Sequence, residues 1–135
     1  MKDQAPRSAA KSCTLSAEPM IFVTDIKASC DFYTAKLGFS VVFTYGEPPF
    51  YGQVQRDGAK LNLRRVEAPV IDPQLRDSED LVSAAITLDD AKPLFLEYQA
   101  SGVDFHQRLR IEPWGARTFI VRDLDGNLIL FAGER

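Results

Sequence analysis

Residues 23–39 read VTDIKASCDFYTAKLGF, and residues 88–105 read LDDAKPLFLEYQASGVDF. The two stretches align at a constant offset of 65 positions, which pairs Asp25 with Asp90, Lys27 with Lys92, Tyr33 with Tyr98 and Ala35 with Ala100. Further along, DGAKLNL (57–63) matches DGNLILF (125–131) at an offset of 68. Similar segments that recur in the same order indicate a duplicated unit, here of about 50–55 residues.

The first copy predicts a strand, a helix and three further strands. The apolar run PMIFV (19–23) is typical of a short buried strand, and Thr24 or Asp25 can then cap a helix by accepting its unpaired N–H groups. Apolar residues at helical spacing continue to Gly38, where a left-handed backbone ends the helix at least cost. Three strands follow, and the turn Asp57-Gly58 joins the last two as a hairpin.

The second copy repeats this order. Residues 81–88 (LVSAAITL) predict a strand, Asp89 or Asp90 a helix cap, and Gly102 the end of the helix. Three strands follow, the last two joined at 124–126. The predicted fold class is therefore α+β, with two βαβββ modules that form a curved mixed sheet. No helix would cover the concave face of this sheet, and such a face is a natural ligand pocket.

The chain divides into a tail and one domain. Residues 1–16 are polar and lack the apolar stretch of a secretory signal, so we expect a flexible N-terminal tail. Residues 17–135 form the domain, with repeat 1 at about 17–66 and repeat 2 at about 81–133. Residues 67–80, which are rich in acidic side chains and contain two prolines, are expected to be an exposed linker. One such domain leaves sheet edges and a concave face open, so we expect a homodimer that allows strands or modules to be exchanged between chains.

Composition narrows the class of protein. The chain of 135 residues is 45% hydrophobic and 26% charged, with a net charge of −3, as is ordinary for one globular domain. This mild acidity argues against nucleic-acid binding, which usually shows as a basic patch. No apolar run approaches the roughly 18 residues of a membrane span. Cys13 and Cys30 have no metal-type spacing and are expected to be free thiols in a reducing cytoplasm.

Two motifs connect the chain to a known family. The first is DIKASCDFYTAKLGF (25–39), and the second is PWGARTFIVRDLDGN (113–127). With these motifs and the duplicated pattern, residues 18–133 resemble the vicinal oxygen chelate superfamily of glyoxalases, bleomycin-resistance proteins and dioxygenases, and within it the bleomycin-resistance proteins. The resemblance implies either metal-dependent catalysis on the concave face or metal-free sequestration of a drug in a pocket shared by two chains.

The resemblance also implies where a metal would be held. The ligand positions of the metalloenzymes lie on the first and fourth strands of each repeat, and here they fall on Glu18, Asn62, Ser83 and Leu130. A divalent ion prefers imidazole and carboxylate ligands, and this set offers one carboxylate. We therefore expect no metal and no cofactor. The single histidine, His106, lies on a different strand and is interpreted as structural or surface.

Aromatic side chains supply the candidate binding residues. Tyr45, Phe50 and Tyr51 surround a Pro-Pro pair in one loop, and large flat side chains suit planar ligands. Packing against the core or a partner chain would explain these three equally well. Trp114, beside the flexible Gly115, corresponds by resemblance to a tryptophan near the drug pocket of bleomycin-resistance proteins; its alternative place is the edge of the core.

Three polar residues are expected to orient the ligand through hydrogen bonds, namely Asn62, Glu18 and Arg117. The leading hypothesis is a non-catalytic binding protein that sequesters a planar small molecule, such as a glycopeptide antibiotic, at a dimer pocket. The acidic residues gather in the 67–80 linker rather than in the expected pocket, which leaves the ligand open. The alternatives are a metal-dependent glyoxalase-type lyase or transferase, or a dioxygenase, and an interaction module without a ligand.

Overall fold

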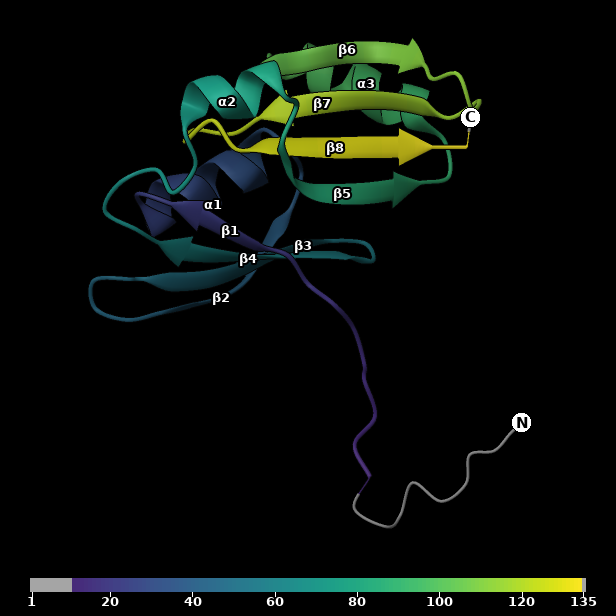
Figure 1. The fold of residues 1–135 in the computed structure, drawn as a ribbon. Helices are drawn as coiled ribbons and strands as arrows, with labels where there is room; N and C mark the ends of the chain where they lie inside the picture. The colour runs from purple at the N-terminus through teal and green to yellow at the C-terminus, as the bar shows by residue number, and fades with distance from the viewer. Residues whose placement is uncertain (1–10, 135) are drawn as a thin grey trace.

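The computed structural model describes residues 11–134, and the duplicated order of elements is present in it (Figure 1). The first module consists of β1 (Met20–Val23), α1 (Ile26–Ala35), β2 (Ser40–Tyr45), β3 (Tyr51–Arg56) and β4 (Ala59–Arg65). The second consists of β5 (Val82–Leu88), α3 (Ala91–Ala100), β6 (Phe105–Ile111), β7 (Arg117–Arg122) and β8 (Leu128–Gly133). The predicted α+β fold of two βαβββ modules is confirmed.

Both long helices begin where a capping aspartate satisfies an otherwise unpaired N–H group. The Asp25 side chain accepts a hydrogen bond of 3.0 Å from the Ala28 N–H, and Asp90 accepts one of 3.2 Å from the Lys92 N–H. Of the two residues that the sequence offers as cap for each helix, the second is therefore the cap. Gly38 follows α1 with a φ of +75°, a left-handed conformation that turns the chain toward β2 at little cost.

The two sheets share one strand order and equivalent registers. The first sheet runs β1-β4-β3-β2 and the second β5-β8-β7-β6, with the first pair of each parallel and the others antiparallel. Met20 pairs with Asn62 in the first sheet, and Ala85 pairs with Leu130 in the second. These pairs keep the sequence offsets of 65 and 68, so the duplication extends to the hydrogen-bonding partners of each strand.

The core lies on the helix side of both sheets. In β1, Ile21 and Val23 are fully buried, while the alternating Met20 and Phe22 are 41% and 36% exposed. This alternation is expected of a strand with one covered face. The buried residues of the two modules form one cluster, and Figure 1 shows α1 between the two sheets. Each sheet therefore keeps one face that turns away from the helices, which we call its helix-free face.

The turn between β7 and β8 fastens the second module to the first. Its Asp125 carboxylate accepts a 2.7 Å hydrogen bond from the Thr24 hydroxyl, and the Asn127 side-chain amide donates to the Phe22 carbonyl at 2.9 Å. Its Asp123 is buried and accepts a hydrogen bond from Tyr33 on α1. The sequence predicts only a hairpin turn here, and the three contacts add a role in holding the modules together.

The segment between the modules is more ordered than the predicted linker. Residues 73–78 form the short helix α2 (Pro73–Ser78), which begins where the Asp72 side chain accepts from the Gln74 N–H. Arg76 is buried, and its guanidinium contacts Asp77 and the carbonyl of Asp125. Of the predicted tail, residues 1–10 lie outside the part that the structure describes, whereas residues 11–16 are exposed and carry no helix or strand.

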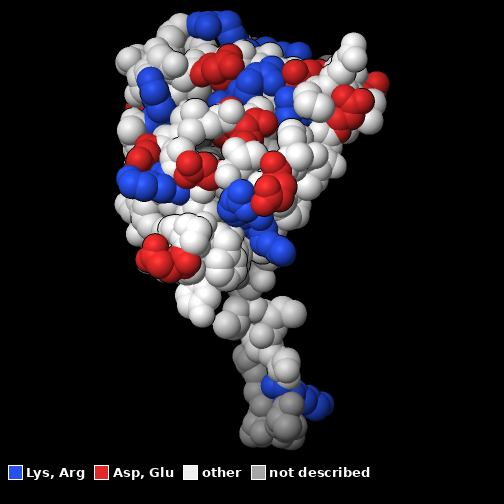
Figure 2. Space-filling model, turned by 90° about the vertical axis from the view of Figure 1, so that its left-hand side faces the viewer, with Lys and Arg blue, Asp and Glu red and all other residues white. Residues whose placement is uncertain are grey.

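Charged side chains of both signs are mixed on the surface that Figure 2 draws. Lysine and arginine alternate with aspartate and glutamate there, without a stripe of one sign. Among residues 11–134, no helix has the length and apolar composition that crossing a membrane requires. The observed surface thus agrees with the mild net charge of −3.

Candidate functional site

Two rows of side chains cross the helix-free face of the first sheet. The strand registers place four residues side by side in each row, namely Met20, Asn62, Gln53 and Phe43 in one, and Phe22, Arg64, Tyr51 and Tyr45 in the other. Neighbours across strands on one face lie close enough to interact. This face therefore brings Asn62, Tyr51 and Tyr45, three of the predicted site residues, onto one surface.

A polar trio occupies the centre of this face. The Gln53 side-chain amide donates to the Asn62 side-chain oxygen at 2.9 Å and to the Glu18 carboxylate at 3.2 Å. The Asn62 amide also donates to Glu18, at 3.4 Å. Asn62 is only 8% exposed, so its hydrogen bonds are made largely away from water. The structure thus joins two predicted site residues, Glu18 and Asn62, and adds Gln53.

Aromatic rings surround the trio on the β2–β3 side. Tyr45 and Phe50 form an edge-on pair with ring centres 5.6 Å apart, and Phe43 and Tyr51 form a tilted pair at the same distance. Tyr45 is 66% exposed and Phe50 49%. Rings that pack against each other and remain exposed offer flat contact area at small entropic cost. Within this chain they do not belong to the core.

Trp114 and Arg117 lie elsewhere in the chain. Trp114 is 75% exposed in the turn between β6 and β7, and Figure 1 shows this turn and the β2–β3 turn at opposite ends of the molecule. Arg117 neighbours residues of α3 such as Lys92 and Leu96, on the helix side of the second sheet. A single copy of the chain therefore does not bring these two residues to the aromatic rings and the polar trio.

The helix-free face of the second sheet has a different composition. Its equivalent rows are Ala85, Leu130, Ile120 and Gln107, and Thr87, Ala132, Thr118 and Arg110. On β5, β8 and β7 these are small or aliphatic side chains, whereas Gln107 and Arg110 on β6 are long and polar. The two faces thus differ most in bulk at their first strands, where Met20 and Phe22 on β1 correspond to Ala85 and Thr87 on β5.

One carboxylate lies beside this second face. Glu112 accepts hydrogen bonds from the Thr118 hydroxyl at 2.7 Å and from Arg110 at 3.0 Å. These two donors, the Thr118 hydroxyl first, lower the pKa of Glu112 from its usual value. Gln107 donates in turn to the Thr118 hydroxyl at 2.9 Å. Glu112 is therefore a fixed anion rather than a candidate proton donor.

The four positions where metalloenzymes of this fold would hold an ion do not fit one. Glu18 and Asn62 are in contact, but Glu18 is engaged by amide donors, and the equivalent positions in the second module are Ser83 and Leu130. Among residues 11–134, no group of three or more His, Cys, Asp or Glu side chains is arranged to hold a metal. His106 lies between Asp80 and Arg122, at 2.7 and 2.9 Å, in a contact that secures the segment after α2.

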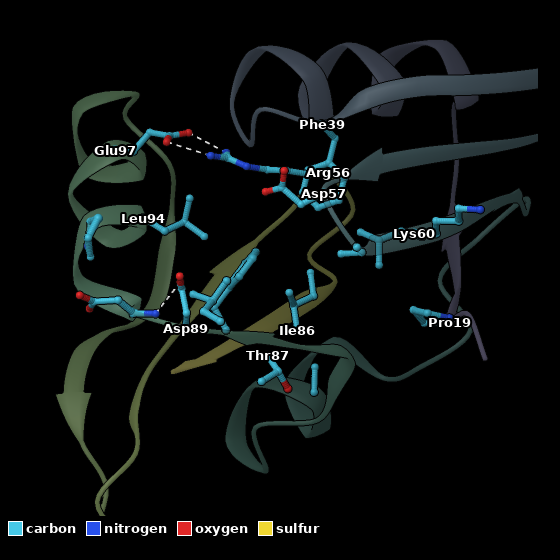
Figure 3. Close-up of a pocket in the computed structure, with 18 of the residues that line it drawn as sticks. Pro19, Phe39, Arg56, Asp57, Lys60, Ile86, Thr87, Asp89, Leu94 and Glu97 are labelled. Carbon is cyan, nitrogen blue, oxygen red and sulfur yellow. Dashed lines mark hydrogen bonds and ion pairs between the residues drawn. The ribbon is translucent and has the colours of Figure 1, made fainter. Parts of the chain in front are cut away.

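A cleft of about 1010 Å³ opens between the modules (Figure 3). Its walls are the β3–β4 turn, the open edge of β5 and the first turns of α3. Apolar groups include Phe39, Leu94 and Ile86, and the ion pair Arg56–Glu97 crosses one end. None of the seven predicted site residues lines it. We call it the inter-module cleft.

Arg56 closes one end of the inter-module cleft. Its two terminal nitrogens donate to the two oxygens of Glu97 at 2.7 and 3.0 Å, and one of them also donates to the Leu37 carbonyl at 2.9 Å. The guanidinium hydrogen bonds lower the pKa of Glu97. The sequence does not indicate this cleft, because its residues come from both modules and the Asp57-Gly58 turn among them indicates only a hairpin. The adjacent acids Asp89 and Asp90 could have indicated a site for a cation, but a helix cap explains two acids at this place equally well.

Comparison with known proteins places this geometry in a family. A model described as Glyoxalase/Bleomycin resistance protein/Dioxygenase superfamily matches residues 16–131. Among solved structures, TioX from Micromonospora sp. ML1 superposes with a TM-score of 0.71 at 21% identity, over 90% of this chain and 100% of that one. A glyoxalase-related enzyme from Clostridium phytofermentans superposes with a TM-score of 0.72 at 18% identity, over 92% and 98%.

A third similar structure is the bleomycin-binding protein of bleomycin-producing Streptomyces verticillus, in complex with copper(II)-bleomycin. It superposes with a TM-score of 0.68 at 24% identity, over 90% of this chain and 98% of that one. At such identities these likenesses establish the fold. A comparison with curated protein sequences finds no match. On the match over residues 16–131, the chain belongs to the glyoxalase/bleomycin resistance protein/dioxygenase superfamily.

Proposed function

We propose that this protein is a non-catalytic binding protein of the bleomycin-resistance type, which sequesters a planar small molecule in a pocket between two copies of the chain. The observation that carries the proposal is the helix-free face of the first sheet. There, exposed aromatic rings surround a polar trio whose amides and carboxylate are already hydrogen-bonded. Such a surface suits a flat ligand with a few polar groups.

The difference between the two sheets supports a pocket shared by two copies. Met20 and Phe22 are bulky and exposed on the first face, whereas Ala85 and Thr87 occupy the equivalent places on the second. If the first face of one copy lay over the second face of another, the size difference would leave room for a ligand between them. Trp114 and the trio, which are apart in one chain, would then come from different copies.

The chemistry of the four positions that would hold a metal supports binding over catalysis. Leu130 stands where a metalloenzyme needs a ligand, and Ser83 is a poor donor for a divalent ion. A glyoxalase-type enzyme would need ligands from both modules. The first module supplies one carboxylate, held by Gln53 and Asn62, and the second supplies none at these positions.

The test is a fluorescence titration with bleomycin. Trp114 is the single tryptophan and is 75% exposed, so a ligand that covers it should change its emission. The variant Tyr51→Ala should weaken binding at least tenfold, and Leu75→Ala, an apolar truncation on α2, should leave it within twofold. If the folded protein shows no change at tens of micromolar bleomycin, that drug is not the ligand. Stoichiometric divalent metal in the purified protein, found by elemental analysis, would instead favour the metalloenzyme.

A further inference from the structure

The inter-module cleft carries an excess of negative charge over apolar walls. Its lining includes four carboxylates, Asp57, Asp89, Asp90 and Glu97, against two basic groups, Arg56 and Lys60, for a net charge of −2. The chain as a whole has a net charge of −3. A concave site lined by an excess of one sign of charge attracts ligands of the opposite charge.

These carboxylates do not share one role. Glu97 is paired with Arg56, and Asp90 caps α3 through the Lys92 N–H. Asp89 uses one oxygen to accept from the Asp90 N–H at 2.7 Å, and its other oxygen remains available. Within residues 11–134, no hydrogen bond or ion pair involves the Asp57 carboxylate. The groups available to a ligand are therefore Asp57 and Asp89.

Figure 3 shows these two carboxylates pointing into the cleft from different walls, Asp57 from the β3–β4 turn and Asp89 from the start of α3. Leu94 points into the space between them. Ile86 on β5 adds apolar surface to the same space. An ionised carboxylate attracts a cation, and apolar side chains favour the burial of a hydrocarbon or ring.

We propose that the inter-module cleft is a second binding site, for an organic cation with an apolar body, such as an aromatic or long-chain amine. The ammonium group lies at Asp57 or at Asp89, the two available carboxylates on different walls, and the apolar body lies along Leu94 and Ile86 between them. Anionic compounds of the same shape are disfavoured by the net charge of −2. A volume of about 1010 Å³ is at the upper end of small-molecule sites, so a drug-sized amine fits.

This site is separate from the helix-free face of the proposed function. Its lining contains no residue of the polar trio and none of Tyr45, Phe50 or Tyr51. It is built within one chain, so it does not need a second copy. The two proposals can accordingly fail independently.

The experiment uses a matched pair of fluorescent probes with the full chain. Dansylcadaverine carries a primary ammonium group on a short chain, and dansylglycine carries a carboxylate on the same fluorophore. Binding is followed by dansyl fluorescence anisotropy at low salt, where exposed charges are least screened. We expect dansylcadaverine to bind at least tenfold more tightly than dansylglycine.

Variants locate the site. The double variant Asp57→Asn/Asp89→Asn removes both free carboxylates but keeps their shape, and asparagine tolerates the φ of 49° at position 57. We expect it to weaken dansylcadaverine binding at least tenfold. The control Asp31→Asn/Glu79→Gln changes the net charge equally at exposed positions outside the cleft, and should stay within twofold. Far-ultraviolet circular dichroism and thermal melting check that every variant folds.

Several outcomes overturn the proposal. The first is that dansylcadaverine does not bind at concentrations up to about 1 mM, because a weaker dissociation constant would not indicate a specific site. Equal loss in the double variant and the charge control means attraction to the overall charge alone. Equal binding of the two probes means that the carboxylates do not select the ligand. Loss of binding in Gln53→Ala, with the cleft variants unaffected, would assign the probe to the helix-free face.

Discussion

The Tyr33 hydroxyl, at the centre of the core, donates a 2.9 Å hydrogen bond to the buried carboxylate of Asp123, 90 positions away in the chain. Tyr33 is fully buried and Asp123 is 6% exposed. The same carboxylate accepts from the backbone N–H groups of Asp125 and Asn127, at 2.9 and 2.8 Å. One side chain thus shapes the β7–β8 turn and binds it to α1 of the other module.

Tyr33→Phe is expected to lower the free energy of unfolding by about 1–2 kcal/mol, because it removes one hydrogen bond to a buried charged group without changing the packing of the ring. Urea denaturation measures the change. Phe95→Leu, a core change on α3 whose ring contacts Phe105 and Phe119 rather than Tyr33, controls for general loosening and should not couple with substitution of Asp123. Additive effects of Tyr33→Phe and Asp123→Asn in a double-mutant cycle would contradict a direct interaction.

The stability should fall in alkaline solution partly because of Tyr33. Burial first, and then the negative charge of Asp123, raise the pKa of Tyr33 well above its usual value of 10. A raised pKa means that the stabilising contribution is complete below pH 10 and is lost as the pH rises toward the folded-state pKa. Unfolding free energies between pH 8 and about 11.5 should fall less steeply in Tyr33→Phe than in the wild type. Parallel curves would contradict the assignment.

Gly126→Ala is expected to lower the free energy of unfolding by about 1–2 kcal/mol. Gly126 has a φ of +83°, and an added Cβ would lie 2.7 Å from the Arg76 guanidinium, which is buried against the turn. Gly58→Ala is the matched control, because an added Cβ there meets no atom within 4 Å and φ is not in the left-handed range. If the two variants lower the melting temperature equally, the contact of Gly126 with Arg76 does not contribute to the loss of stability.

Glu97→Gln should reduce the stability only where the carboxylate is ionised. Hydrogen bonding to Arg56 lowers the pKa of Glu97 from its usual 4.5, so its contribution is present above pH 4.5 and is lost as the pH falls through the folded-state pKa. Because the pair is partly exposed, we expect a difference of about 0.2–1 kcal/mol at pH 7 and none at pH 2.5. Urea titrations at both pH values measure it. A difference that persists at pH 2.5 would indicate lost packing instead.

Phe43→Lys should shift the protein from dimer to monomer if the helix-free face of the first sheet meets a second copy. Phe43 is 39% exposed on that face, and burying an unpaired ammonium in an interface is costly. Analytical ultracentrifugation across a concentration series measures the shift. Leu75→Lys places the same charge on α2, where Leu75 is 50% exposed, and should not change association. A monomeric wild type would remove the basis of the shared pocket.

Local chemistry made much of the fold predictable. Gly38 and Gly102 follow the ends of the two long helices. The capping aspartates, Asp25 and Asp90, each lie one residue before the first residue of a helix. Met20 pairs with Asn62 and Ala85 with Leu130 at the offsets that the repeat defines. Caps, turns and alternation act over a few residues, so one sequence suffices to read them. The helix at 73–78 was not predicted, because six residues are too few to show the spacing of apolar residues that identifies a helix.

The candidate site was only partly predictable. The family resemblance selects Glu18 and Asn62 as positions on the first and fourth strands, and nearness in one loop groups Tyr45 with Phe50. Gln53 could have been found from the alternation of β3, which puts it on the same face as Tyr51. Arg117 illustrates the limit, because its neighbour Thr118 faces the helix-free side while Arg117 itself faces α3. A shift of one residue along a strand reverses the face.

The sequence by itself determined the two βαβββ modules and, through two motifs, the resemblance to the family, since both depend on patterns within short stretches. Only the tertiary structure decided that α1 lies between the sheets, that the DLDGN turn holds the modules through Tyr33 and Thr24, and that a cleft opens between Asp57 and Asp89. These contacts join residues far apart in the chain. They follow from how two similar modules bury their shared core, which no single stretch of sequence encodes.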